Sequence, residues 1–335
     1  GIGEVVTVHK PVERTIVVWV DNAELIRILN AKDKVVGVDY GNSKMEIQFP
    51  LLSKLPCVGP IGFEPDFEAI LSLNPDLLLP FYTTTAKMKE KFPGVAVVFL
   101  GLYYPDLSNP DGSRFTDGVR KLGYIFDRKE AAEEYINWRI DWIDKIKSRT
   151  EGLSEGKKPR VFICSDKGII VGEKTFRTSG KIDTVSQMCI LAGGKNIAED
   201  LPEFVQPAYA ITVDPEWVIE QNPEFIFVHD GRTPYGYGMD DPETRLKGIR
   251  DIYMNSPVLA NVAAVKTGNV YIMNGIFRND VTGGVTGAVY IAKLLYPNLF
   301  EDLDPEEIHQ EYLTRFMQVD YDLDEHGVFV YPEVN

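Results

Sequence analysis

A repeated pattern restricts how the two halves of this chain can fold. Residues 68–79 (Glu-Ala-Ile-Leu-Ser-Leu-Asn-Pro-Asp-Leu-Leu-Leu) and 216–228 (Glu-Trp-Val-Ile-Glu-Gln-Asn-Pro-Glu-Phe-Ile-Phe-Val) have the same order of residue types. Each copy begins with a glutamate in a helical segment, reaches an Asn-Pro pair that ends the helix, and continues through an acidic residue into an apolar run typical of a buried strand. Chance rarely gives two copies with the same offsets. The repeat predicts two α/β lobes of similar construction.

The longest helical pattern of the chain lies between the two copies, from Arg128 to Arg149. Its apolar residues follow the i, i+3, i+4, i+7 spacing, and Asp127 with Glu130 resembles a capping box at its start. At about 1.5 Å per residue, such a helix is a rod of roughly 33 Å. It is either one more surface helix of a single domain or a stiff link between lobes. We expect the second arrangement, with an N-terminal lobe at 1–126, a linking helix at 127–150, and a C-terminal lobe with its tail at 151–335.

Strands and helices alternate on both sides of this helix, and the strands are apolar throughout. Continuous apolar strands indicate a sheet that is covered on both faces, which is typical of parallel strands. The expected strands are residues 15–20, 34–38, 57–58, 76–80, 95–100, 160–164, 224–228 and 269–273. The expected helices are residues 22–29, 66–73, 84–91, 181–191, 214–221 and 286–295, with one more in the tail that includes His309 and Tyr312. The fold class is therefore α/β, with two lobes that have central, mostly parallel sheets and are joined by one long helix.

Size and charge narrow the classes of function. A chain of 335 residues is long for one hydrophobic core and comfortable for two. No apolar run reaches the roughly 18 residues of a membrane-spanning helix. A net charge of −15 at pH 7 opposes binding to the phosphates of nucleic acid. We expect a monomer that binds no nucleic acid.

Aromatic and cationic residues occur in the segments that follow the predicted strands. In open parallel sheets, ligands bind beyond the carboxyl ends of the strands, so these segments are where a site is expected. The candidates are Tyr40, Phe63, Tyr82, Tyr103, Tyr104, Arg177, Arg232, Tyr235, Tyr237, Phe277 and Arg278. Arginine pairs with carboxylates or catecholates through two hydrogen bonds, and aromatic rings cover an organic body. The set predicts a rigid, partly apolar, anionic ligand.

Several motifs resemble those of one transporter family. Residues 13–18 (Glu-Arg-Thr-Ile-Val-Val), 35–38 (Val-Val-Gly-Val), 66–78 (Asp-Phe-Glu-Ala-Ile-Leu-Ser-Leu-Asn-Pro-Asp-Leu-Leu), 191–197 (Leu-Ala-Gly-Gly-Lys-Asn-Ile) and 270–273 (Val-Tyr-Ile-Met) are similar to the cobalamin and ferric-siderophore class of ABC-transporter substrate-binding proteins. The resemblance implies the class III periplasmic binding protein fold, with two lobes joined by one helix and a ligand between them. It also implies docking on a permease dimer through one glutamate per lobe, Glu68 and Glu216. An acid in the first turn of a helix is also stabilised by the helix dipole without any partner.

The function that this resemblance implies is capture of an iron complex, a ferric siderophore or haem, for delivery to an ABC importer at the membrane. An Fe(III) chelate ranks above cobalamin because a net anionic complex has more use for three arginines. We expect no enzymatic activity, catalytic residue or cofactor. The expected location is extracytoplasmic, either periplasmic or lipid-anchored at the outer cell surface. Since the chain begins with Gly1 rather than methionine, we expect that a signal segment has been removed.

A site for a free transition metal is the nearest alternative. Such a site needs three or four converging His, Asp or Glu ligands. The chain has four histidines, and they are scattered. His229 ends a predicted strand and could be a direct ligand, although a hydrogen-bonded core histidine is the simpler interpretation. The cysteines are Cys57, Cys164 and Cys189, and we expect buried free thiols rather than disulfides or metal ligands.

A two-lobed nucleotide-sugar enzyme is the second alternative. Such enzymes hold phosphate on a glycine-rich turn between a strand and a helix. Residues 283–287 (Gly-Gly-Val-Thr-Gly) are the only candidate, and they lack the G-x-G-x-x-G spacing. No Gly-x-Ser-x-Gly or His-Glu-x-x-His motif occurs in the chain. The enzyme interpretation therefore ranks last.

Overall fold

The computed structural model describes residues 5–60, 65–102, 105–166, 175–204, 210–231, 236–238 and 242–334. The chain forms two compact units. Unit 1 consists of Gly1–Tyr104, Asn109–Ile140 and Glu311–Tyr321, and unit 2 of Pro105–Ser108, Asp141–Gln310 and Asp322–Asn335. The sequence did not indicate that part of the tail belongs to the first unit. Helix α6 (Lys129–Thr150) contributes residues to both units.

Unit 1 is built on a four-stranded parallel sheet with the order β2-β1-β3-β4. Its strands are β1 (Thr15–Val17), β2 (Val35–Val38), β3 (Leu77–Leu79) and β4 (Ala96–Val97). Its helical segments are α1 (Val20–Ile28), η1 (Lys32–Lys34), α2 (Tyr40–Ser43), η2 (Leu52–Lys54), α3 (Phe67–Ser72), η3 (Tyr82–Thr84), α4 (Thr85–Lys91), α5 (Arg114–Ile125) and the π-helical segment η7 (Tyr312–Met317). Ile16 and Leu78 of the sheet pack with Ile70 of α3 and Met88 of α4 in one core cluster. The α/β prediction for this lobe is confirmed.

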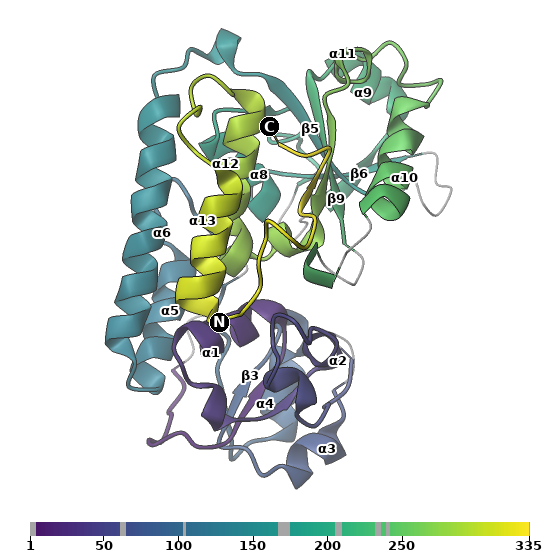
Figure 1. Cartoon of the computed structure of the whole chain (residues 1–335). Helices are drawn as coiled ribbons and strands as arrows, with labels where there is room; N and C mark the ends of the chain where they lie inside the picture. The colour runs from purple at the N-terminus through teal and green to yellow at the C-terminus, as the bar shows by residue number, and fades with distance from the viewer. Residues whose placement is uncertain are drawn as a thin grey trace. The chain divides into compact units, whose positions relative to one another are not determined.

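Unit 2 is built on a seven-stranded sheet with the order β11-β10-β9-β5-β6-β8, and β7 pairs with β5. Its strands are β5 (Arg160–Ser165), β6 (Phe176–Ser179), β7 (Lys195–Asn196), β8 (Ala210–Val213), β9 (Phe225–Asp230), β10 (Val270–Asn274) and β11 (Val330–Tyr331). Its other helical segments are η4 (Glu155–Lys157), α8 (Thr184–Leu191), α9 (Pro215–Gln221), η5 (Gly236–Gly238), α10 (Pro242–Met254), α11 (Ala263–Thr267), η6 (Gly275–Arg278), α12 (Asp280–Leu295) and α13 (Pro305–Glu311). Helices α8 and α12 cover one face of the sheet, and α9, α10 and α11 cover the other (Figure 1). The fold class is therefore α/β in both units.

The second sheet is more mixed than the sequence suggested. Strands β5, β9 and β10 pair in parallel, as expected for buried apolar strands, and the two-residue strand β7 also pairs in parallel with β5. Strand β6 runs antiparallel to both β5 and β8, and β11 runs antiparallel to β10. Strand β11 lies within the aromatic segment 328–331 near the end of the chain, which therefore completes the edge of the sheet in unit 2. The two antiparallel strands β6 and β8 were not predicted, because their residues are only partly apolar.

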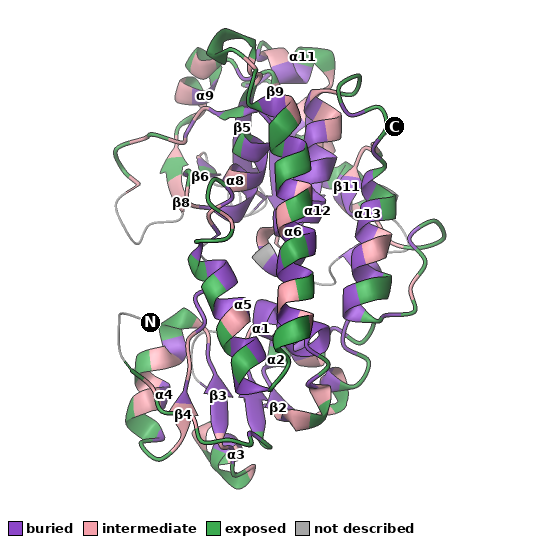
Figure 2. Ribbon diagram, turned by 90° about the vertical axis from the view of Figure 1, so that its left-hand side faces the viewer, coloured by how far each residue is buried: buried purple, intermediate pink, exposed green. Residues whose placement is uncertain are grey.

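Helix α6 is the long helix expected at residues 128–149. Its buried positions include Ala132, Tyr135 and Ile143, and they alternate with exposed positions along the helix at the predicted spacing (Figure 2). The predicted N-cap at Asp127 is wrong. Asp127 has a left-handed backbone with φ of 55°, and the Arg128 N–H bonds the carbonyl of Gly123 at 2.7 Å. These contacts satisfy carbonyls at the carboxyl end of α5, so Asp127 ends that helix rather than beginning the next one.

Helix α5 was not predicted, and its glycines explain why. A Cβ atom on Gly118 would lie 2.4 Å from the carbonyl oxygen of Leu100, and one on Gly123 would lie 2.6 Å from Cβ of Ala132. Close packing therefore requires glycine at both positions, although glycine weakens a helical pattern in the sequence.

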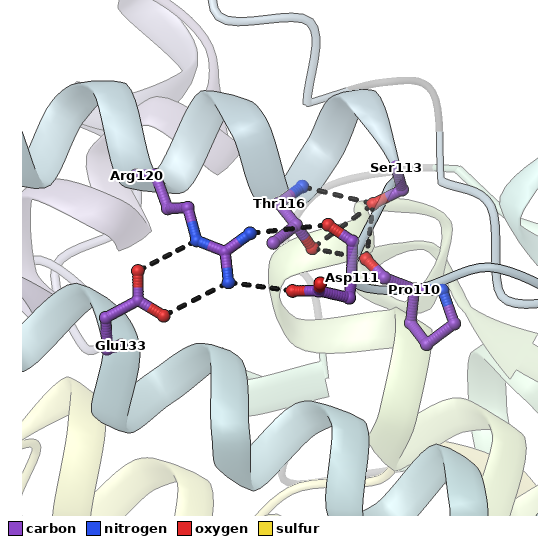
Figure 3. Close-up of polar contacts among 6 residues, drawn as sticks. All are labelled: Pro110, Asp111, Ser113, Thr116, Arg120 and Glu133. Carbon is purple, nitrogen blue, oxygen red and sulfur yellow. Dashed lines mark hydrogen bonds and ion pairs between the residues drawn. The ribbon is translucent and has the colours of Figure 1, made fainter.

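A polar network fixes α5 against α6 within unit 1 (Figure 3). The Arg120 guanidinium donates to both carboxylate oxygens of Glu133, at 2.8 and 3.1 Å, and to Asp111 Oδ1 at 2.7 Å. Ser113 caps α5 by accepting from the Thr116 N–H at 3.1 Å. These carboxylates raise the pKa of Arg120. The side chains are partly exposed, so the network orients the two helices more than it stabilises the fold.

The three cysteines are free thiols. Cys164 and Cys189 are buried, as expected, whereas Cys57 is exposed. Cys57 forms an isolated parallel bridge with Val38, at the place where the sequence predicted a short strand. The expectation of burial is therefore wrong for Cys57, because it lies at the margin of the sheet.

A buried arginine holds the tail segment within unit 1. The Arg27 side chain is 4% exposed and donates to the carbonyl of Met317 at 2.6 and 2.8 Å and to that of Gln318 at 3.0 Å. We expect Arg27→Ala to lower the free energy of unfolding by about 2–4 kcal/mol, because it leaves buried carbonyls without donors. Urea denaturation measures this loss. The exposed Arg128→Ala is the matched control, and an equal effect of both substitutions would contradict the assignment.

Candidate ligand-binding site

A small cavity lies in unit 2 at the carboxyl ends of β5 and β9. Its polar lining consists of Ser165, Arg177, Ser179, Asp183, His229 and Arg278. The cavity has a volume of about 20 Å³, which is room for roughly one water molecule or one ligand oxygen. Three of these residues occupy one row across neighbouring strands, because Ser165 of β5 pairs with Arg177 of β6 on one side and with His229 of β9 on the other. Directly paired residues face the same side of a sheet, so this row forms one wall of the cavity.

An ion pair with a buried carboxylate fixes the orientation of Arg278. Its Nε and Nη2 atoms lie 3.0 and 2.9 Å from Asp183 Oδ2. Asp183 is 1% exposed, and its other oxygen accepts from the Val185 N–H at the start of α8. Removing either partner would leave a desolvated charge, so the pair holds the guanidinium in place at the rim of the cavity.

Arg177 differs from Arg278 because its charge is not compensated. It lies on β6 with its residue exposed, and its guanidinium has no hydrogen bond or ion pair with the residues that the structure describes. A guanidinium carried on a strand beside a cavity, with no partner among the described residues, offers a planar pair of donors to a carboxylate or another oxyanion.

His229 adds an uncharged ring nitrogen to the same cavity. Its residue is 9% exposed, and Nε2 has no hydrogen-bond partner among the described residues. Burial, together with the positive charge of Arg278, lowers the pKa of His229 to about 4, and a backbone hydrogen bond at Gly275 has a smaller, opposite effect. The imidazole is therefore uncharged at pH 7. In this form its ring nitrogen can accept a hydrogen bond or bind a metal ion.

Unit 1 presents an aromatic surface at the carboxyl edge of its own sheet. The Trp19 ring stacks on Phe81 with centroids 4.1 Å apart, and Phe81 meets Tyr82 edge-on at 4.5 Å. Tyr40 and Tyr82 are 54% and 39% exposed. These residues follow β1, β2 and β3, which are neighbours in the sheet. An apolar or planar ligand surface would find aromatic cover here.

Buried Asp39 organises this aromatic edge. Its carboxylate accepts from the backbone N–H groups of Trp19, at 3.2 Å, and of Gly41, also at 3.2 Å. Trp19 has a φ of 82°, which is unusual for a residue other than glycine and persists only where neighbours fix it. Burial raises the pKa of Asp39 to about 6, although these N–H donors favour the charged form.

The sequence matches the periplasmic binding protein family over residues 16–276. The chain belongs to that family. A structure described as the TroA-like periplasmic binding protein FepB from Veillonella parvula has a TM-score of 0.77 at 20% identity, covering 98% of this chain and 97% of that one. The molybdate-binding protein MolA of Haemophilus influenzae is 22% identical, covering 94% of this chain and 89% of MolA. CeuE from Helicobacter pylori with nickel bound has a TM-score of 0.68 at 16% identity, covering 95% of this chain and 97% of that one.

These similarities confirm the class III fold and the class of ABC-transporter substrate-binding proteins. Proteins of this type act outside the cytoplasm and deliver small-molecule ligands to ABC permeases. Within the described residues, no helix has both the length and the apolar character to cross a lipid bilayer. The same residues contain no group of three or more His, Cys, Asp or Glu side chains placed to hold a metal ion.

The candidate residues of this binding protein divide into those at the two surfaces described above, those outside the described residues, and a third group in the interior. Arg177 and Arg278 lie together at the cavity of unit 2, and Tyr40 and Tyr82 lie at the aromatic edge of unit 1. Phe63, Tyr103, Tyr104, Arg232 and Tyr235 lie outside the described residues. The third group, Tyr237 and Phe277, is interior.

Tyr237 and Phe277 pack inside unit 2. Tyr237 is 3% exposed and its hydroxyl lies 2.8 Å from Nε2 of His309. Phe277 is fully buried and packs against Tyr290 and Phe329. The sequence places both residues after a strand, but it does not say whether a side chain turns inward or outward. In this structure both side chains contact the interior of unit 2 rather than solvent.

Sequence reasoning missed Trp19, Phe81 and Asp183. Trp19 was assigned to the interior of a strand predicted at residues 15–20, whereas β1 ends at Val17. If the strand had been predicted to end at Val17, Trp19 would have been selected, like Tyr40, as a residue that follows a strand. Asp183 precedes α8 and resembles an ordinary N-cap, so the sequence offers no sign that it also holds Arg278.

The lowered pKa of His229 predicts a loss of stability in acid. The unfolded chain binds a proton near pH 6.5, whereas the folded imidazole binds one only near pH 4. The contribution of His229 to the free energy of unfolding is therefore fully present above pH 6.5. It falls by up to about 3 kcal/mol as the pH drops toward 4. His309, whose pKa is lowered to about 3 by burial, acts in the same direction.

We expect His229→Gln to flatten this dependence between pH 7 and pH 5. Thermal unfolding of wild type, His229→Gln and the exposed control His326→Gln across this range tests the expectation. The variant and the control should diverge in acid, and parallel curves for all three proteins would contradict the assignment.

Proposed function

We propose that this binding protein captures an Fe(III) chelate, a ferric siderophore or haem, and delivers it to the permease dimer of an ABC importer. The observation that supports an anionic ligand is Arg177, whose guanidinium borders the cavity without a partner among the described residues. The buried acid Asp183 already compensates Arg278, so the two arginines together leave one net positive charge for a ligand.

The aromatic edge of unit 1 supports an organic component in the ligand. Trp19, Tyr40, Phe81 and Tyr82 offer ring faces and edges, and aromatic rings cover planar or apolar groups well. A ferric chelate combines both features, because its metal-binding oxygens are anionic and its scaffold is organic. Cobalamin shares the organic body but has less need of arginines, so it ranks second among large ligands.

A small oxyanion is the second candidate, and the polar lining of the cavity favours it. A volume of about 20 Å³ has room for roughly one ligand oxygen, so an oxyanion would enter the cavity with one of its oxygens. Arginine side chains and backbone N–H groups are the usual partners of tetrahedral oxyanions. The Haemophilus influenzae relative is a molybdate-binding protein, although its identity to this chain is only 22%.

Titration of intrinsic fluorescence tests the proposal. The panel consists of ferric siderophores, haem, cobalamin, molybdate and ferric ion, each added to wild type, Arg177→Ala and the exposed control Arg128→Ala. We expect saturable binding of a ferric chelate that weakens about 10- to 100-fold in Arg177→Ala, because a charge-assisted pair of hydrogen bonds is lost. The control should bind as wild type does.

The other outcomes separate the candidates. Binding of molybdate alone would favour the oxyanion function. Binding of cobalamin alone would replace the iron complex. Undiminished binding of a ferric chelate by Arg177→Ala would exclude the cavity of unit 2 as the anionic site.

We also propose that docking on the permease uses Glu68 of α3 and Glu216 of α9. Both residues are exposed in the first turn of their helices. Neither carboxylate has a hydrogen bond or ion pair within the described part of the chain. Each therefore remains available to a cationic side chain on a partner.

A further inference from the structure

Helices α3 and α9 are held in their units by the same kind of contact. Each is followed within two residues by an asparagine with a left-handed backbone, Asn74 and Asn222, both with φ of 44°. In unit 1 the Arg14 guanidinium donates to the carbonyl of Leu73 at 2.7 and 2.9 Å. In unit 2 the Arg160 guanidinium donates to the carbonyl of Asn222 at 2.9 Å. An arginine at the start of a central strand thus binds the last carbonyls of each helix.

A carboxylate completes this arrangement in both units. Asp76, two residues after the first asparagine, accepts from the Arg14 N–H at 3.0 Å. Glu224, at the same offset from the second asparagine, accepts from the Arg160 N–H at 3.0 Å. The repeat in the sequence is therefore also a repeat of contacts, and it fixes each helix against its sheet in the same way.

Each helix also exposes one aliphatic side chain at the same offset from its glutamate. Leu71 is 66% exposed and Ile219 is 37% exposed. They follow Glu68 and Glu216 by three residues, and residues with this spacing lie on the same face of a helix. A single exposed aliphatic residue is ordinary. Here the same aliphatic position recurs on two helices that are held by the same kind of contact. On both helices it lies beside an unpaired glutamate, which points to a shared role.

The charge of these surfaces limits the partner. The chain has a net charge of −15, and both carboxylates lack a cationic partner among the described residues. A complementary surface therefore offers a cation beside an apolar depression. Because the chain presents the same pair twice, the fitting partner offers that surface twice, as a homodimer does. A second copy of this acidic chain would bring like charges together.

We propose that Leu71 and Ile219 contact the permease homodimer together with Glu68 and Glu216. Each permease subunit then receives one acidic and one aliphatic side chain from this protein. This inference rests on the proposed transport function and adds the apolar half of the contact. The glutamates steer and orient the encounter, and the aliphatic side chains slow dissociation because they lose their exposure to water on docking.

Binding to the ABC importer of the source organism, reconstituted in lipid nanodiscs, tests this inference. The proteins to compare are wild type, Leu71→Asn/Ile219→Asn, Glu68→Gln/Glu216→Gln and the control Leu51→Asn/Val258→Asn. Leu51 and Val258 are 54% and 47% exposed and lie outside both helices. We expect the aliphatic pair to weaken importer binding about tenfold or more, chiefly through faster dissociation. The control should bind the importer as wild type does. All four proteins should bind with equal affinity whichever ligand the fluorescence titration identifies.

The remaining outcomes each overturn a stated part. If the glutamate variant loses binding while the aliphatic variant binds as wild type does, the apolar half is wrong. If the control weakens binding as much as the aliphatic variant does, the contact is not local to α3 and α9. If wild type does not bind the importer but sediments as a dimer that Leu71→Asn/Ile219→Asn dissociates, the occupant is a second copy, and the transport function itself fails.

Discussion

Parallel pairing of the central strands is the constraint on which both units depend. Strand β1 lies between β2 and β3, and β9 lies between β5 and β10, with all four pairings parallel. A parallel neighbour can be reached only by a crossover, so successive strands end at the same edge of the sheet. Residues distant in sequence, such as Ser165 and His229, are thereby brought side by side. Both the aromatic edge of unit 1 and the cavity of unit 2 follow from this geometry.

The charges at the cavity make this edge a candidate site for an anionic ligand. Asp183 is buried and accepts hydrogen bonds from Arg278 and from the start of α8, so its desolvation is offset by specific donors. Arg177 extends from a paired strand at the rim of the cavity, and no acid among the described residues compensates its charge. His229 stays neutral beside the two guanidinium groups because burial disfavours its charged form. The residues that line the cavity therefore carry an excess of positive charge before any ligand binds.

The sequence predicts those parts of the fold that depend on local pattern. Apolar runs identified β1, β2, β3, β5, β9 and β10, and helical spacing identified α6, because these signals lie within a single segment. Helix α5 was missed because Gly118 and Gly123 are required by neighbours outside that helix. The antiparallel strand β6 was missed because its exposed Arg177 interrupts the apolar pattern.

The candidate site was predictable only in part, for a related reason. The sequence shows which residues follow a predicted strand, and this rule selected Arg177, Arg278, Tyr40 and Tyr82. The direction of a side chain depends on the whole core, so the same rule also selected Phe277, which is fully buried. The sequence showed the repeated asparagines and acids around α3 and α9, because each copy of the repeat lies within one short segment of the chain.

We propose that the cavity of unit 2 holds the anionic part of the ligand. Anomalous diffraction from crystals grown with a ferric siderophore, and separately with molybdate, tests this placement. We expect one anomalous peak in unit 2 for the metal that binds, with ligand oxygens within hydrogen-bonding distance of the Arg177 and Arg278 guanidinium groups. A bound ligand whose oxygens contact neither arginine would contradict it.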